Sequence, residues 1–262
     1  MKNERIKAGL INYIEMDLRR AFLNWKCPVA VGSIYLLLLY NDNLTLSMVD
    51  RIRWMVGSKT FIVVALMLAA APYAASLCDE TEYKYSMQAI LRGSEGMYYI
   101  SKVLVTFFSS AVIMLSAFLL DAVTYYWQYG LPGARELEEH IRINPAYAAC
   151  LASGNYIGYV ILIGLQLAAL AGSMAVIGLV CSVFVQNRML VYAFPVAIVY
   201  VWDMMAIRFL GYNVGCAVTL YQMGVETINF QFATQSRLLY YIEVLVIVIC
   251  GGMIICTKQK KK

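Results

Sequence analysis

Six long apolar runs, separated by short polar connections, dominate the chain. They cover approximately residues 29–40, 59–77, 103–125, 156–185, 189–210 and 238–256. Apolar runs of this kind predict membrane-spanning helices, and they lack the strict alternation of a lipid-facing β-strand. We therefore predict an all-α polytopic membrane protein with six transmembrane helices, organised as a single domain over residues 1–262.

The first 26 residues are basic and amphipathic. The apolar face of the predicted helix is formed by Leu10, Ile14, Leu18, Ala21, Phe22 and Trp25. Charged and polar side chains cover most of the remaining surface of this helix. Such a helix is expected to lie in the plane of the membrane interface, in contact with lipid, and to lead into the first span.

Residues 79–102 form the longest polar stretch on one side of the predicted membrane domain. Asp79, Glu80 and Glu82 open a first short helix, residues 92–94 break it, and a second short helix runs into Lys102. The three carboxylates suit a helix N-terminus, and Lys102 is expected to anchor the next span at the interface. A polar hairpin at the membrane face suits docking to a soluble partner, and a solvated connector is the alternative.

Three local patterns bear on how the spans pack and bend. Pro72 and Pro195 fall inside predicted spans and predict kinks, which neighbouring helices can accommodate by satisfying the freed carbonyl groups. Gly164, Ala168 and Gly172 recur every four residues in the fourth span, a spacing that lets helices approach closely in lipid. A short charged helix is predicted for residues 134–141, and residues 211–237 form a further outer segment.

Composition and charge agree with a membrane protein. The chain is 61% hydrophobic and 14% charged, which is far more apolar surface than one soluble core requires. With the N-terminus inside, most of the 21 Lys and Arg residues fall on the side of the two termini, so both termini and residues 79–102 are placed in the cytoplasm. Orientation explains the net charge of +5, and we expect no binding to nucleic acid.

Signals for catalysis are nearly absent. The single histidine, His140, falls in a predicted outer loop, and no His/Cys cluster has the spacing of metal ligands. No phosphate-binding loop is present, so this chain is not expected to hydrolyse ATP alone. We expect no catalytic, cofactor-binding or metal-binding residue. Cys150 and Cys216 both fall in predicted outer loops, where a disulfide between them is an open alternative.

Four ionisable residues lie inside predicted spans: Asp121, Asp203, Arg208 and Glu243. Their distances along the helices place all four toward the outer leaflet. Charged groups are costly in hydrocarbon, so they are candidates for a translocation path or outer gate. The alternatives are structural: Arg208 pairs with Asp203 or Glu243, or the side chains extend to the interface.

An amphipathic first helix, six spans, a hairpin between spans two and three, and a broken outer segment between spans five and six together resemble the membrane subunit of a type-2 ATP-binding-cassette exporter. The local resemblance is strongest over residues 82–102. There an acidic helix is followed by Leu91-Arg92-Gly93-Ser94, and Tyr99-Ile100-Ser101-Lys102 leads into the third span.

The resemblance implies a coupling helix at residues 79–91 that sits in a groove of a separate, soluble ATPase subunit holding ATP and Mg²⁺. The implied docking residues are Asp79, Glu80, Glu82, Tyr83, Met87 and Arg92. It also implies a second permease copy or a paralogue, a bacterial cell membrane, and re-entrant outer helices over residues 214–235.

The leading functional hypothesis is therefore a permease subunit that exports a hydrophobic or amphipathic substrate, such as a peptide, an antibiotic or a lipid. A membrane sensor, immunity or scaffold protein that transports nothing is the alternative from another class. An intramembrane enzyme using Asp203 and Glu243 is disfavoured, because no second catalytic element accompanies these two carboxylates.

Overall fold

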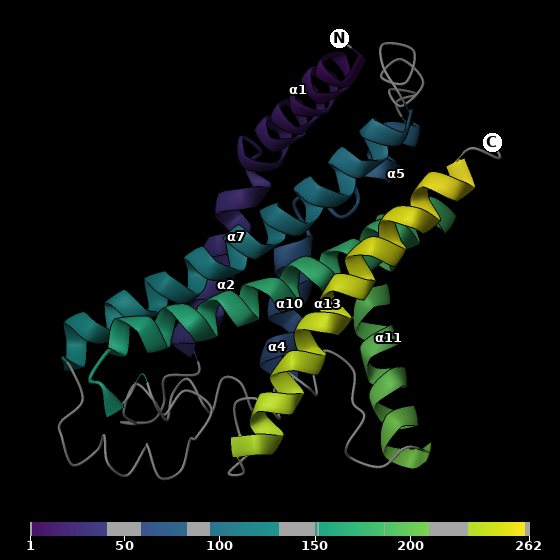
Figure 1. Ribbon diagram of the computed structural model, residues 1–262. Coiled ribbons are helices and arrows are strands. Elements are labelled where there is room, and N and C mark those ends of the chain that lie inside the picture. The colour runs from purple at the N-terminus through teal and green to yellow at the C-terminus, as the bar shows by residue number, and fades with distance from the viewer. Residues whose placement is uncertain are drawn as a thin grey trace.

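The computed structural model describes residues 2–40, 59–82, 95–130, 150, 152–185, 187–209 and 230–259 (Figure 1). Within these ranges every regular element is a helix. The helices are α1 (Lys2–Phe22), α2 (Lys26–Tyr40), α4 (Lys59–Ala70), α5 (Ser76–Glu82), α7 (Glu95–Tyr129), α10 (Tyr156–Phe184), α11 (Arg188–Phe209) and α13 (Phe230–Gln259). The all-α prediction is confirmed for the part of the chain described.

Two of these helices are long and apolar enough to cross a membrane, namely Gly96–Tyr129 within α7 and the whole of α10. A third candidate is the bent pair Ile11–Phe22 and Lys26–Tyr40, whose axes meet at 54°. The chain is therefore compatible with a membrane-embedded protein. The described helices give two or three spans by length and composition, and the predicted six are not confirmed.

The second predicted span is interrupted at Pro72. Helix α4 ends at Ala70, residues 71–75 form turns, and α5 follows. Proline has no N–H to continue the helical ladder, which explains the break. The Tyr192 hydroxyl of α11 donates a hydrogen bond of 3.0 Å to the Ala71 carbonyl oxygen. A neighbouring helix thus satisfies the carbonyl group directly before the proline.

The centre of the molecule is the pair α7 and α10, which share the most extensive helix–helix contact. Small residues on α10 allow this approach. A Cβ atom at Gly172 would lie 2.7 Å from the Phe107 ring and 2.8 Å from the Phe107 carbonyl oxygen. A Cβ atom at Gly164 would lie 3.0 Å from Leu115 and from Phe118. The predicted close-packing role of this stripe is confirmed.

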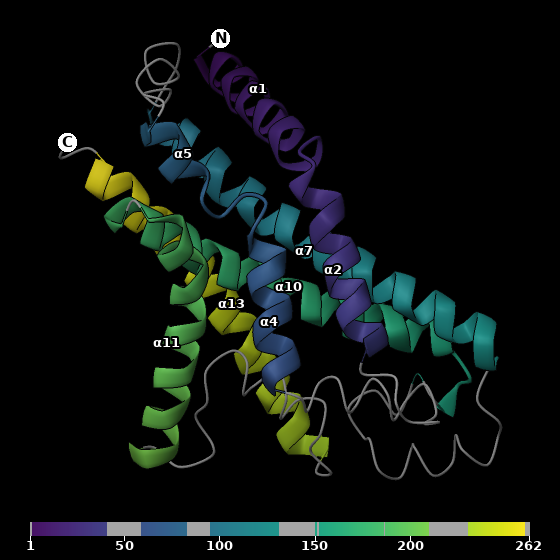
Figure 2. The ribbon, with the colours of Figure 1, turned by 180° about the vertical axis from the view of Figure 1, so that it is seen from behind.

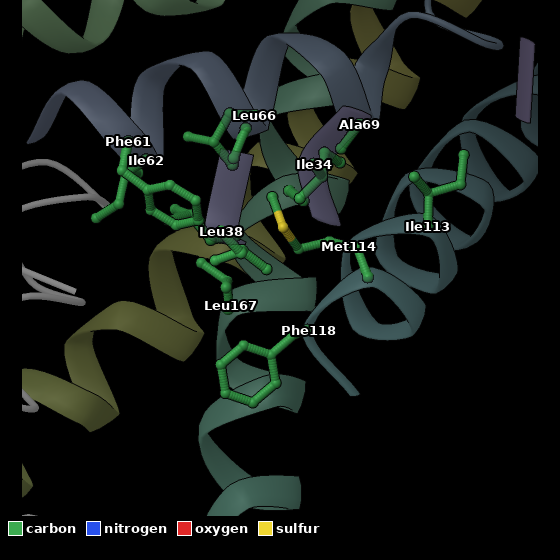
Figure 3. Close-up of a cluster of buried hydrophobic side chains, with 14 of the residues drawn as sticks. Ile34, Leu38, Phe61, Ile62, Leu66, Ala69, Ile113, Met114, Phe118 and Leu167 are labelled. Atoms are coloured by element: carbon green, nitrogen blue, oxygen red, sulfur yellow. The ribbon is translucent and has the colours of Figure 1, made fainter. Parts of the chain in front are cut away.

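Helices α2 and α4 pack across this central pair. Their buried side chains meet those of α7 and α10 in one apolar cluster (Figure 3), which includes Ile34, Leu38, Phe61, Ile62, Leu66, Met114, Phe118 and Leu167. In lipid, such a cluster is held by dense van der Waals contact more than by exclusion of water.

Helix α1 turns its apolar face toward protein instead of the predicted lipid. It packs along the first half of α7, and its apolar face is used within the protein. Ala21 is buried against Tyr73 and Val105, and three more side chains of this face pack on the same cluster: Ile14, Leu18 and Phe22. Trp25, predicted on the same face, is 70% exposed because the helix has ended before it. The apolar face that predicted lipid contact is therefore largely covered by protein.

The predicted hairpin between spans two and three is only partly described. Its first helix is represented by α5, and the predicted second helix at residues 95–101 is continuous with the third span in α7. The predicted break at 92–94, the helix at 134–141, Cys216 and most of the outer segment at 211–237 lie outside the described residues. Cys150 carries a free thiol.

Helix α5, the start of α1 and the end of α13 lie toward the same end of the molecule (Figures 1 and 2). The turn between α10 and α11 meets α5 at this end as well, through the ion pair of Arg188 with Asp79. This grouping places the beginning of the polar segment 79–102 next to α1 and α11.

Candidate functional site: a buried charge network between α1, α5 and α7

Lys102 is the centre of the most highly connected polar site among the described residues. It is fully buried on α7, seven residues from the start of that helix. Its Nζ atom donates to Asp17 Oδ1 at 2.9 Å, to the Tyr73 hydroxyl at 2.8 Å and to Glu80 Oε1 at 2.5 Å. An ammonium group has three donors, so its hydrogen-bonding capacity is filled.

The rings of two tyrosines also face this ammonium group. Lys102 Nζ lies 5.0 Å from the centroid of the Tyr73 ring and 5.4 Å from that of Tyr98. The negative face of an aromatic ring attracts a cation at this range. The cation is therefore enclosed by two carboxylates and two aromatic rings.

The two carboxylates are each held by further donors. Asp17, fully buried on α1, also accepts a hydrogen bond of 2.8 Å from Ser101 Oγ. Glu80, buried on α5, also accepts one from the Tyr98 hydroxyl and one of 3.3 Å from the Arg20 guanidinium.

The network is electrically balanced. Asp17 and Glu80 supply two negative charges, and Lys102 and Arg20 supply two positive charges. Isolated buried charges cost several kcal/mol each, and pairing with saturated hydrogen bonds is what makes their burial tolerable. Arg20 is the most exposed of the four, with 39% of its side chain accessible. These ion pairs connect α1, α5 and α7.

Helical spacing explains how each element presents these groups. On α1, Tyr13 precedes Asp17 by one turn, and the Tyr13 ring meets Tyr98 edge-on with centroids 5.9 Å apart. On α7, Tyr98 and Lys102 are also one turn apart. Both helices thus direct a tyrosine and a charged residue toward the same junction.

Two predictions are corrected here. Lys102 is not an interfacial anchor, because its ammonium group finds its counter-ions inside the protein and has no exposed surface. Glu80, predicted as a docking residue, is buried and engaged by three donors, so its side chain is turned inward. The acidic character of α5 serves internal pairing at this position.

Asp17 is the network member that the sequence interpretation missed. It falls on the same stripe of α1 as Ile14, Leu18 and Ala21. A charge among the apolar residues of an amphipathic helix is a signal for a buried partner elsewhere in the chain. The neighbouring Arg19 and Glu15 pair with each other on the surface of α1 at 2.7 Å, so charged residues surround Asp17 in the sequence.

A second ion pair attaches α5 to α11. Arg188 Nε lies 2.8 Å from Asp79 Oδ1, and the two side chains are 45% and 35% exposed. Beside it, the Cys78 thiol lies 3.5 Å from the Val185 carbonyl oxygen. Adjacent carboxylates on α5 thus reach opposite neighbours: Glu80 reaches α1 and α7, and Asp79 reaches the start of α11.

The remaining predicted docking residues are less fully described. Glu82 is the last residue of α5, and its side chain is outside the description. Tyr83, Met87 and Arg92 also lie outside the described residues. Among the described docking candidates, only the half-exposed Asp79 offers part of its carboxylate to solvent.

The four predicted gate residues lie on three helices, α7, α11 and α13. Asp121 is buried on α7, Glu243 is half-buried on α13, and Arg208 is exposed near the end of α11. The side chain of Asp203 is outside the description. The ends of α7 and α11 lie well apart in both ribbon views (Figures 1 and 2).

A groove of about 390 Å³ lies between the last turns of α7 and the first turns of α10. Its lining is mainly apolar and includes Leu119 and Val123 from α7 and Val160 from α10, with Asn155 as a polar member. This lining does not form the polar vestibule that the four ionisable residues predicted.

The described residues contain no cluster of three or more His, Cys, Asp or Glu side chains that could hold a metal ion. In the Lys102 network the donors and acceptors bind one another, so the geometry provides mechanical coupling between helices. Comparison of the chain with protein-family models, with curated proteins and with solved structures found no match. The resemblance to an exporter subunit therefore rests on the sequence features alone.

Proposed function

We propose that this chain is the permease subunit of an ATP-driven exporter for a hydrophobic or amphipathic substrate, such as a peptide, an antibiotic or a lipid. In this proposal a separate soluble subunit binds ATP and Mg²⁺ and docks on the polar segment that begins at Asp79. A second permease copy or a paralogue completes the pathway in a bacterial cell membrane, with both termini in the cytoplasm.

The observation that supports this proposal best is the double attachment of α5. This short helix directly precedes residues 83–94 of the polar segment, and its two carboxylates reach different helices. Glu80 is bonded to Lys102 and Arg20, while Asp79 is paired with Arg188. A force applied after Glu82 would therefore be divided between two parts of the membrane domain.

The mechanism follows from this geometry. Movement of α5 is passed through Glu80 to α1 and α7, because buried charge pairs cannot separate without leaving charges unpaired. The same movement also acts on the contact with α11, which is made by Asp79 and by the hydrogen bond from Tyr192 to the Ala71 carbonyl. Asp121, Asp203, Arg208 and Glu243 remain candidates for the substrate path, which the second permease subunit would complete.

The decisive experiment is purification of the tagged chain from its native membrane in mild detergent, with quantification of ATPase activity and of the soluble protein that accompanies it. We expect an ATPase in equimolar amount, whose rate of hydrolysis changes when it leaves the permease. A preparation without ATPase, even after crosslinking in the membrane, would overturn the proposal and favour the sensor, immunity or scaffold hypothesis.

A charge reversal at Glu82 tests the docking site. Glu82→Arg should reduce the amount of bound ATPase at least tenfold while the purified membrane subunit keeps its thermal stability. Gln128→Arg introduces the same cationic side chain at an exposed position near the other end of α7 and serves as the control. Equal binding by both variants would count against docking on this segment. Glu80 is unsuitable for this test because its removal would disturb the buried network.

A further inference from the structure

We propose that the contact between α5 and the start of α11 is a releasable latch, closed by the Asp79–Arg188 ion pair, while α1, α5 and α7 move as one body. This inference concerns a conformational change of the chain itself. It goes beyond the proposed function, and its test requires neither an ATPase nor a substrate.

The first observation is the difference in exposure between the two attachments of α5. The Asp79 and Arg188 side chains are 35% and 45% exposed, although the Asp79 Oδ1 atom that meets Arg188 is itself shielded from water, whereas Lys102 and Asp17 are fully buried. Water and salt compete with an exposed pair, so its net contribution is small and it can open at low cost. A buried pair cannot open in this way, because each charge would be left without a partner.

The second observation is the kind of packing beneath the latch. The buried side chains where the end of α4, the turn before α5, α5, α10 and α11 meet are small: Ala70, Ala74, Ala75, Cys78, Ala175 and Val191. Tyr192 packs against them. Small side chains make few van der Waals contacts each, so separating them forfeits little dispersion energy. A small void of about 10 Å³ lies next to this cluster, with Met174 and Tyr192 in its lining.

The third observation is that a proline lies in each of the two chain segments that form this contact. Pro72 interrupts the chain between α4 and α5, and Pro195 lies inside α11. A Cβ atom at Gly178 of α10 would lie 3.5 Å from Pro195 Cγ and 3.2 Å from the Val191 carbonyl oxygen. Proline removes a helical hydrogen bond and permits a bend, so both sides of the contact can yield.

The fourth observation is the course of α11 beyond Pro195. Its first two turns supply Arg188, Tyr192 and the buried Val191, which contact the α4–α5 region and α10. Farther along, Val201 and Met205 are exposed, and the helix diverges from the rest of the bundle (Figures 1 and 2). A helix fastened at one end and exposed at the other is placed to swing about its fastened end.

Paired spin labels on the purified full-length chain in lipid nanodiscs test the latch. In a background without reactive cysteines, labels at Val201 and Val123 report the distance from α11 to α7, and labels at Ile11 and Ile100 report that from α1 to α7. All four positions are exposed. Asp79→Asn and Arg188→Gln should each add a second, displaced population to the α11–α7 distances and leave the α1–α7 distances unchanged.

The double variant Asp79→Arg with Arg188→Asp restores an ion pair and should return the α11–α7 distances to the wild-type distribution. Glu15→Gln breaks a surface ion pair within α1 and is the matched control that should change neither distance. Unchanged α11–α7 distances in the Asn and Gln variants, or an equal change in the α1–α7 distances, would overturn the latch. Failure to find an ATPase partner would remove the proposed function and leave this result unaffected.

Discussion

The two attachments of α5 use the same chemistry and have opposite physical character. On one side, Glu80 enters a buried network with Lys102, Asp17 and Arg20, in which every charge is balanced. On the other side, Asp79 makes one half-exposed ion pair with Arg188 above a layer of alanines. In both attachments a carboxylate of α5 pairs with a cation on a neighbouring helix. The difference in burial determines whether the attachment can open.

This difference shows how one short helix can be fixed to one neighbour and released from another. A buried ion network contributes little net stability relative to an apolar core, but it is very sensitive to loss of one member. An exposed pair contributes little net stability, and losing one of its members costs little. The inner attachment is therefore suited to transmit force, and the outer attachment is suited to open.

The largest effect is expected from removing the central cation. Lys102→Met leaves two carboxylates buried with Arg20 alone to balance them, which should lower the free energy of unfolding by about 3 to 5 kcal/mol. Thermal unfolding in detergent, followed by size-exclusion chromatography, measures the loss. Arg19→Met removes a surface cation from α1 and should lower the free energy of unfolding by less than about 1 kcal/mol. Similar losses in the two variants would contradict the inner network.

A smaller loss is expected from Asp17→Asn, because the amide keeps the shape and the acceptor for Ser101. Losing a charged hydrogen-bond partner of Lys102 should cost about 2 kcal/mol. Combining Asp17→Asn with Lys102→Met removes one charge of each sign and leaves Glu80 with Arg20. The double variant should be at least about 1 kcal/mol more stable than the sum of the single losses predicts. Additive losses would show that the two residues do not interact.

The apolar runs in the sequence predicted α10 and α11 to within one residue of their bounds, whereas α7 and α13 each begin eight residues before the predicted spans. The stripe of small residues was also correctly predicted, and the kink predicted at Pro72 is a full break between α4 and α5. Pairing across the chain was not predictable in the same way. Asp17 and Lys102 are 85 residues apart, and no local rule links them.

The candidate site shows the same limit more sharply. The acidic start of residues 79–102 was recognised, but Asp79, Glu80 and Glu82 were indistinguishable as sequence. Their separate roles depend on which side of α5 faces α1 and which faces α11. The gate prediction has the same limit, because depth along a helix does not specify direction around it. The positions of Asp121 and Arg208 in the sequence therefore do not show which neighbours they face.

A comparison of two glycines on α10 tests whether the packing difference extends beyond the charges. Gly172→Ala places a methyl group against the Phe107 ring and backbone in the α7–α10 contact and should cost about 1 to 3 kcal/mol. Gly178→Ala meets the Val191 carbonyl oxygen at 3.2 Å beneath the latch, where α11 can yield. Alanine also has a higher helix propensity than glycine, so Gly178→Ala should change the free energy of unfolding by less than about 1 kcal/mol. Equal thermal shifts would contradict a softer contact at α11.

The smallest change is expected from salt, and it separates the two attachments without any mutation. Raising ionic strength from about 0.01 M to 1 M shortens the screening length from about 30 Å to 3 Å, which weakens exposed pairs far more than buried ones. In the wild-type chain, salt should therefore increase the displaced α11 population and leave the α1–α7 distances unchanged. Asp79→Asn already lacks the exposed pair, so its α11 distances should respond little to salt. A salt response of equal size in Asp79→Asn would mean that another charge contact holds α11. A wild-type α11 distribution that stays constant over this range would mean that the alanine layer and the Tyr192 hydrogen bond, and not the Arg188 ion pair, keep the joint closed.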